Sequence, residues 1–207
     1  MNDEKLSQAI THLVKVDTTM AKIVPLVGPI RVPRRQPNFK GLVRIIINQQ
    51  LSGKAASTIF SRAENCLDGG RFTPKNFSLI GEERLRGVGV STAKARYILK
   101  LSNMLESDPQ FVSRLKHCSD EDAYNQLISI KGIGDWSARV FLMFYLSRAN
   151  VFAAGDKSIE TAISSLYSRD HYFDEDVRNS LLALWSPHIS TACVVLWRWI
   201  DSGRPTA

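Results

Sequence analysis

The chain has 207 residues, of which 44% are hydrophobic and 23% are charged, and its formal net charge is +7. This balance is typical of a globular protein with its own core, and the basic charge favours a polyanionic partner without excluding a basic protein that binds none. The three cysteines, Cys66, Cys118 and Cys193, are too few for an iron–sulfur cluster and too scattered for a disulfide framework or a zinc site.

The N-terminus is polar, and no apolar run approaches the length of a membrane span. We therefore expect an intracellular protein with no membrane partner. Its expected location is the cytoplasm or nucleoid, or the nucleus if the source is eukaryotic.

Hydrophobic residues recur at helical spacing almost throughout the chain. The segment 150–155 is short and extended, and no convincing pair of strands appears, so we predict an all-α fold. The predicted helices cover about residues 4–20, 39–50, 53–67, 75–80, 82–86, 91–106, 108–116, 119–129, 136–148, 157–168, 174–185 and 189–201.

Two glycine turns have similar sequences. RGVG at 86–89 and KGIG at 131–134 each precede a predicted helix that starts with small residues and carries a basic side chain. Two copies are too few for a solenoid, and they fit two helical hairpins instead.

The second turn has the features of an anion site. Its glycines permit backbone shapes closed to other residues, and the N–H groups of the following helix face outward at the positive end of the helix dipole. Such a site suits a DNA phosphate and grips the backbone without reading sequence. A tight helical corner that binds nothing is the simpler interpretation of a G-x-G turn alone.

The sequence IKGIGDWSA at 130–138, followed about twenty residues later by Asp156, resembles the helix-hairpin-helix–Gly/Pro/Asp (HhH-GPD) DNA glycosylases. The similarity is greatest to the 3-methyladenine DNA glycosylases of the AlkA and Mag type. Further segments resemble that branch in the same order: LVRIIINQQLS at 42–52, the glycine–lysine turn at 87–96, and WSP at 185–187 with LWR at 196–198.

The resemblance implies a two-lobed helical fold with the active-site cleft between the lobes and no N-terminal β domain. One lobe would cover about residues 38–148, with the helix-hairpin-helix at about 119–148, and the other about 1–37 plus 149–207. The implied protein is a monomeric DNA repair enzyme. It flips an alkylated base out of double-stranded DNA and hydrolyses its N-glycosidic bond, with 3-methyladenine, 7-methylguanine and ethenoadenine as the usual substrates.

Asp156 is the candidate catalytic residue, because cleavage of the glycosidic bond builds positive charge on the sugar and a nearby carboxylate stabilises it. Asp is also a favoured helix N-cap, and the two roles can coexist. The resemblance places Trp136, Trp197 and Gln50 in the substrate pocket, and Leu51 or Ser52 as the wedge that fills the duplex. The residues assigned to DNA binding are Leu51, Ser52, Gly87, Gly89, Lys94, Lys131, Gly132, Ile133, Gly134, Ser137 and Ala138.

No cofactor is expected, although the hairpin of the family often carries a Na⁺ or K⁺ ion. Its ligands here would be the backbone carbonyls of Ile128, Ile130 and Ile133. A lyase activity is not expected, because the lysine of lyase members falls where this chain has Trp136, and Lys157 is better interpreted as a solvent or phosphate contact.

Two of the departures from the family pattern adjoin the assigned site residues. Asp135 stands where many relatives have Arg, and a carboxylate weakens a phosphate grip unless it points away. Gly155 precedes Asp156 where an acidic residue is common. Alternatives to the alkylation-repair interpretation are a non-catalytic DNA-binding protein, a bifunctional glycosylase/lyase, a glycosylase for deaminated bases, and a metabolic all-α enzyme with coincidental glycine turns.

Overall fold

The computed structural model describes residues 3–33, 35–67, 70–168 and 172–205, and these ranges contain helices and connecting segments but no strand. The predicted all-α fold is confirmed. The chain divides into two compact units, one formed by Arg35–Leu146 and the other by Met1–Arg34 together with Ser147–Ala207. The sequence prediction had divided it at 38–148 and at 1–37 plus 149–207.

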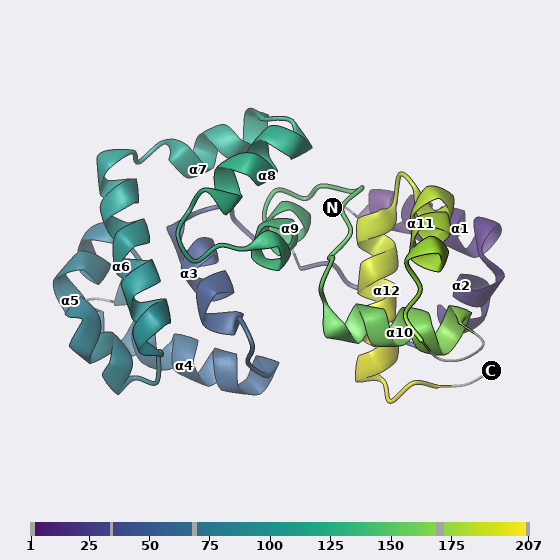
Figure 1. Cartoon of the computed structure of the whole chain (residues 1–207), viewed down its shortest axis with the longest axis horizontal. Helices are drawn as coiled ribbons and strands as arrows, with labels where there is room; N and C mark the ends of the chain where they lie inside the picture. The colour runs from purple at the N-terminus through teal and green to yellow at the C-terminus, as the bar shows by residue number, and fades with distance from the viewer. Residues whose placement is uncertain (1–2, 34, 68–69, 169–171, 206–207) are drawn as a thin grey trace. The chain divides into compact units, whose positions relative to one another are not determined.

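The unit Arg35–Leu146 is built around α3 (Figure 1), whose residues Leu42, Val43, Ile45, Ile46 and Ile47 are buried. Helix α3 packs against α4, α6 and α9, while α5 pairs with α6 and α8 with α9. The helices of this unit are α3 (Phe39–Asn48), α4 (Gly53–Asn65), α5 (Pro74–Gly87), α6 (Thr92–Ser107), α7 (Phe111–Arg114), the 3-10 turn η2 (Leu115–His117), α8 (Asp120–Ile128) and α9 (Asp135–Phe144).

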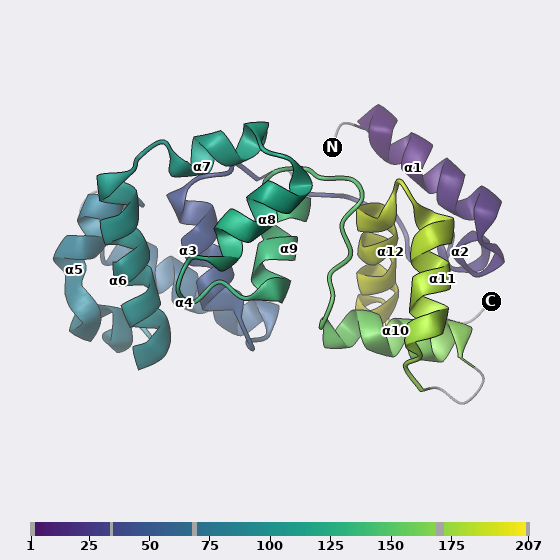
Figure 2. The ribbon, with the colours of Figure 1, turned by 45° about the horizontal axis from the view of Figure 1, so that its top comes forward.

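The second unit packs around α12, in which every residue from Ile189 to Leu196 is buried. Helices α1, α10 and α11 contact it, and Figure 2 shows α10 and α11 beside it. The helices of this unit are α1 (Asp3–Val16), α2 (Thr18–Ile23), α10 (Lys157–Tyr167), α11 (Glu175–Trp185) and α12 (Ile189–Asp201).

The single helix predicted at 4–20 is wrong, because the chain breaks at Asp17. This residue has extended backbone angles, and its Oδ1 accepts hydrogen bonds from the N–H groups of Thr19 and Met20 at the start of α2. Its Oδ2 accepts from Tyr167 Oη at 2.9 Å and from Trp185 Nε1 at 2.7 Å. Three segments distant in sequence therefore meet on one buried carboxylate.

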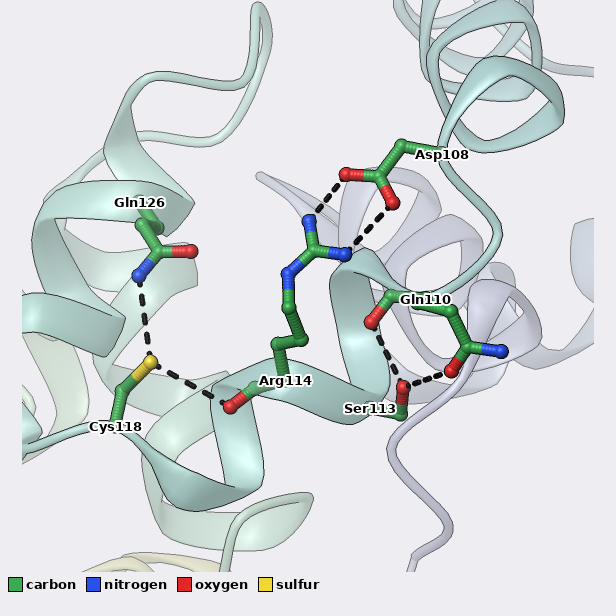
Figure 3. A network of polar contacts seen from close by, with 6 residues as sticks. All are labelled: Asp108, Gln110, Ser113, Arg114, Cys118 and Gln126. Carbon is green, nitrogen blue, oxygen red and sulfur yellow. Dashed lines mark hydrogen bonds and ion pairs between the residues drawn. The ribbon is translucent and has the colours of Figure 1, made fainter.

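The single linking helix predicted at 108–116 is also wrong, because Asp108 ends α6 in a non-helical conformation. Arg114 pairs with both carboxylate oxygens of Asp108 (Figure 3). Cys118 receives a hydrogen bond from Gln126 Nε2 at 3.3 Å, and its Sγ lies 3.5 Å from the carbonyl of Arg114. These contacts join the end of α6 through α7 to α8, which leads into the hairpin.

Within the described ranges, no single helix is long and apolar enough to cross a membrane. Helices α11 and α12 pass that test only as a pair, and the pair is bent by 120° at its break.

Candidate functional site

The turn between α8 and α9 is a tight corner closed by its own backbone. The N–H of Ile130 bonds to the carbonyl of Leu127 at 3.1 Å, and the N–H of Ile133 bonds to the carbonyl of Ile130 at 2.9 Å. Gly132 lies between them with φ +94°, a left-handed conformation that L side chains rarely adopt. A Cβ on Gly132 would lie 2.4 Å from Cγ of Tyr97, so the corner also needs glycine for its packing on α6.

The second glycine of the turn has a different role from the first. Gly134 has φ −97° and ψ −177°, which any residue can adopt, and a Cβ there would meet open space. The prediction that both glycines serve backbone shape is therefore wrong for Gly134. As the N-cap of α9 it offers no side-chain acceptor to the first turn. A helix start of this kind suits an outside anion.

The earlier turn at 87–89 is not a second copy of this corner. Its positive φ falls on the second glycine, Gly89 at +103°, rather than on the first. A Cβ on Gly89 would lie 3.3 Å from Ile59, whereas one on Gly87 would meet nothing. The Ser91 side chain caps α6 by accepting from the N–H of Lys94. The two turns therefore share a sequence pattern but not a register.

Asp135 is engaged within the α8–α9 pair. Its Oδ1 accepts from Tyr124 Oη at 2.6 Å and from Arg139 Nε at 2.8 Å, and the hydrogen bond to Asp135 raises the pKa of Tyr124. Arg139 offsets much of the carboxylate charge within one helical turn. The departure from the family pattern at Asp135 is thus accommodated inside the α8–α9 pair.

Lys94, predicted as a DNA contact, is directed into the protein. Its Nζ donates to the carbonyls of Ile47 at 2.9 Å and Gln49 at 2.6 Å, at the C-terminal end of α3. Burial lowers the pKa of this lysine. Two of its three ammonium protons are used on the backbone, so the structure gives Lys94 a capping role, and its phosphate contact stays a prediction.

Gln49 was not singled out from the sequence, yet it joins the end of α3 to the hairpin. Its Nε2 donates to the carbonyl of Gly132 at 2.8 Å and lies 2.9 Å from Ser137 Oγ. The predicted pocket residue Gln50 is exposed and has a left-handed φ of 54°. No sequence signal distinguishes the two glutamines, because their roles depend on where α3 ends.

The two wedge candidates, Leu51 and Ser52, come directly after Gln50 in the chain. Leu51 is 39% exposed, a large apolar side chain left in solvent, whereas the Ser52 hydroxyl caps α4 by accepting from the N–H of Ala55. Leu51 is therefore the better candidate of the two.

The remaining hairpin residues predicted to bind DNA differ in exposure. Lys131 is exposed, whereas Ile133, Ser137 and Ala138 are buried. The N–H of Ala138 bonds to the carbonyl of Gly134 at 2.9 Å, so it is not available to a phosphate, and the prediction for Ala138 is wrong in that respect.

Asp156 begins α10, and three donors converge on one of its carboxylate oxygens. Its Oδ1 accepts from the N–H of Ser158 at 3.0 Å, from the N–H of Ile159 at 3.1 Å and from Trp197 Nε1 at 3.0 Å. The first two are N-cap bonds, so Asp156 is a helix cap. The third comes from α12 and holds the carboxylate in one orientation.

The segment leading to Asp156 is held by the start of α12. Ser190 Oγ accepts from the N–H of Val151 at 3.1 Å and lies 2.7 Å from the carbonyl of Arg148, and the N–H of Ser190 bonds to the carbonyl of Ala149. The segment 150–155 is non-helical, as predicted. Gly155, next to the carboxylate, has φ +74°.

The other ionisable groups near Asp156 are poor candidates for covalent chemistry. Lys157 pairs with Glu160 at 2.8 Å on an exposed face. Cys193 is fully buried, and burial together with the charge of Asp156 raises the pKa of its thiol to about 12. The other two cysteines, Cys66 and Cys118, are only half-buried.

The predicted pocket tryptophans belong to different units. Trp197 is half-buried and bonded to Asp156 in the same unit, whereas Trp136 is half-buried in the first turn of α9, in the other unit. Trp185 and Trp199 are buried core residues.

The carbonyls proposed for a monovalent cation lie in the hairpin turn. The Ile130 carbonyl accepts a hydrogen bond from the N–H of Ile133. Among the backbone hydrogen bonds of turns, loops and caps in the described ranges, none has the Ile128 or Ile133 carbonyl as its acceptor. Since each carbonyl oxygen has two lone pairs, the donor set fits Na⁺ or K⁺. No cluster of three His, Cys, Asp or Glu side chains suited to a metal occurs in the described part of the chain.

Comparisons with known proteins agree with this geometry. The model of the family described as "HhH-GPD superfamily base excision DNA repair protein" matches residues 43–187. DNA-3-methyladenine glycosylase 1 of Schizosaccharomyces pombe is 32% identical over 170 residues, which are 78% of this chain and 73% of that protein.

A Bacillus subtilis relative, YfjP, is 32% identical over 169 residues, which are 79% of this chain but only 59% of YfjP. The solved structure of the S. pombe 3-methyladenine DNA glycosylase in complex with abasic DNA superposes with a TM-score of 0.86 at 27% identity. It covers 97% of this chain and 100% of that one.

Proposed function

This chain belongs to the HhH-GPD superfamily of base excision DNA repair proteins, and from that premise we propose that it is a monofunctional DNA glycosylase for alkylated bases. The observation that carries the proposal is the carboxylate of Asp156, held on one oxygen by two backbone N–H groups and the indole of Trp197. The proposed substrates are duplexes with 3-methyladenine, the base for which the relatives are named, and with 7-methylguanine or ethenoadenine, which the family resemblance implies.

The proposed reaction is a hydrolysis. The bond between C1′ of the flipped nucleotide and the base nitrogen breaks, and the base leaves with the bonding electron pair. Water adds its hydroxyl to C1′. Its remaining proton goes to the base when that base is neutral, as ethenoadenine is. When the base is cationic, as 7-methylguanine is, the proton goes to solvent and the base leaves as a neutral molecule. Positive charge builds on the sugar as the bond lengthens, and the ionised Asp156 stabilises it electrostatically and can orient the water. Because Trp197 and the helix start fix one carboxylate oxygen, little reorganisation is needed during the reaction.

Binding uses other residues. The start of α9 and exposed Lys131 would hold the phosphate backbone, and a Na⁺ or K⁺ on the hairpin carbonyls would add charge facing a phosphate. Trp136 and Trp197 would stack on the electron-poor alkylated base, Gln50 would lie near it, and Leu51 would fill the gap in the duplex. Hydrolysis requires no redox cofactor, and the protein would work as a monomer in the compartment that holds DNA.

Asp156→Asn tests this proposal. All three donors meet one oxygen, and the amide oxygen of Asn can replace it, so the cap and the Trp197 bond persist while the charge is lost. We expect an unchanged melting temperature and excision slowed about a hundredfold or more, the scale of losing an electrostatic stabiliser. Excision of cationic 7-methylguanine should suffer less than that of neutral hypoxanthine.

Asp174→Asn is the matched control. Asp174 caps α11 through the same pair of bonds, which its Oδ1 accepts from the N–H groups of Asp176 and Val177. The Asp174→Asn variant should excise damaged bases at the wild-type rate. If Asp156→Asn also excises every lesion at the wild-type rate, Asp156 is only a cap. Wild-type protein that binds duplex DNA but excises none of the lesions would favour the alternative of a non-catalytic DNA-binding protein. Excision confined to hypoxanthine or uracil would instead make it a glycosylase for deaminated bases.

A further inference from the structure

The end of α3 and the hairpin are joined by two side chains that the proposed chemistry does not use. We propose that Gln49 and Lys94 are positioning residues that hold the phosphate-binding hairpin in register with the loop at 50–52. The inference rests on the proposed function, since the hairpin's role in binding DNA belongs to it. Its first test is made on the free protein and needs neither DNA nor activity.

Gln49 provides the direct link. Its amide nitrogen has two protons, and each has an acceptor: the Gly132 carbonyl at 2.8 Å and Ser137 Oγ at 2.9 Å. A carbonyl can only accept, which requires the nitrogen of the amide, rather than its oxygen, to face Gly132. The Gln49 side chain therefore bonds both to Gly132 in the corner and to Ser137 in the first turn of α9.

Lys94 holds Gln49 in place. Helix α3 ends at Asn48, and Gln49 leaves it in an extended conformation with φ −50° and ψ 128°. The ammonium of Lys94 bridges the carbonyls of Ile47 and Gln49 across this change of direction. A cation at the negative end of a helix dipole is stabilising, and a side chain from α6 ties a second helix to the same point.

These links fix the position of the loop at 50–52. The residues that follow Gln49 are exposed Gln50 and Leu51, and then Ser52, which caps α4. The loop is anchored at one end by Gln49 and at the other by Ser52, so the spacing between Leu51 and the start of α9 is fixed before DNA binds. A phosphate grip and a wedge that act on one bent duplex need such a fixed spacing.

Amide hydrogen exchange on the free protein tests the link. Gln49→Met keeps the length of the side chain and removes both protons. The hydrogen-bonded amides of Ile133 and Ala138 should exchange about tenfold faster than in the wild type, on the scale of losing ordinary hydrogen bonds. The amide of Phe77, at the start of α5 in the same unit, should be unchanged.

A pH series on DNA affinity provides the second test. Gln49→Glu is nearly isosteric, but the ionised carboxylate has no proton for Gly132, and repulsion between oxygens should weaken binding of an abasic duplex about tenfold at pH 7.5. The introduced carboxyl faces acceptors, so its pKa should lie above the usual 4.3 or so, and protonation restores one donor. The affinity of the variant relative to wild type should therefore recover as the pH falls to about 5.5.

Asn48→Asp controls for charge, because it adds a carboxylate one residue away that has no place in the link. Relative to wild type, the DNA affinity of Asn48→Asp should fall less at pH 7.5 and recover less at low pH than that of Gln49→Glu. The relative affinity of Gln49→Met should not change with pH. Lys94→Met should also speed exchange at Ile133.

Unchanged exchange at Ile133 in Gln49→Met would overturn the proposal. Equal acceleration at Phe77 would also overturn it, by showing a merely structural role. Identical pH series for Gln49→Glu and Asn48→Asp would do the same. If the exchange result holds while no duplex is bound, the link is real and the proposed function has failed.

Discussion

The geometry of the hairpin corner predicts that substitutions at its two glycines, Gly132 and Gly134, have different effects on stability. In Gly132→Ala the new residue must adopt φ near +94°, which costs about 1–2 kcal/mol for an L side chain. Its Cβ would also lie 2.4 Å from Cγ of Tyr97, and moving a packed ring costs about 1–3 kcal/mol more. We therefore expect Gly132→Ala to lower the free energy of unfolding by about 2–5 kcal/mol.

Urea unfolding followed by circular dichroism measures this loss, and Gly134→Ala is the control. Its backbone is permissible for alanine and its Cβ meets no atom, so its stability should lie within about 0.5 kcal/mol of wild type. Its affinity for duplex DNA should nevertheless fall, because the new methyl group stands where a phosphate would approach. Coupling with Tyr97→Ala should recover the steric part of the Gly132→Ala loss but not the backbone part. The reasoning fails if Gly132→Ala unfolds at the wild-type urea midpoint.

Four further predictions concern the rest of the molecule. Trp136→Ala should slow base excision more than it lowers the melting temperature, and a purely thermal effect would make Trp136 a core residue. Asp17→Asn should cost about 1–3 kcal/mol in urea unfolding, because an amide N–H₂ cannot accept from Trp185 Nε1; unchanged stability would contradict the network drawn around Asp17. Cys193 should resist a thiol reagent at pH 8 until the protein unfolds, since burial keeps it protonated; labelling as fast as at the other two cysteines would refute this. Affinity for undamaged duplex DNA should fall steeply between low and moderate salt, and a flat titration would argue against phosphate binding.

The helices could be predicted well from the sequence because their apolar spacing is regular, and the errors fall where one polar side chain overrides that spacing. Asp17 lies inside an apolar repeat, and the capping pattern Asp-Thr-Thr was the available signal for the break. Asp108 ends α6 in a similar way, with Arg114 on its carboxylate. Periodicity records which face is buried, but it does not record where a side chain bonds to the backbone.

The site was predictable only as far as its pattern is local. Asp156 follows from the family motif, and its capping role follows from its place before a helix. The direction of Lys94 and the choice of Gln49 over Gln50 depend on how α3 meets α6 and α9, which are distant in sequence. The difference between Gly132 and Gly134 depends on Tyr97 in the same way, because the ring that excludes a Cβ comes from α6.

The bond between Trp197 and Asp156 has a spectroscopic consequence. The chain has four tryptophans, and the indole protons of Trp185 and Trp199 have acceptors elsewhere, on Asp17 and on the Pro205 carbonyl. A nitrogen–proton NMR correlation spectrum therefore shows a sparse indole region, in which one resonance belongs to the Trp197 proton whose nitrogen lies 3.0 Å from the carboxylate oxygen. The chemical shift of that resonance reports on the hydrogen bond between Trp197 and the Asp156 carboxylate. It therefore shows how binding of a damaged base changes the carboxylate, with no added label.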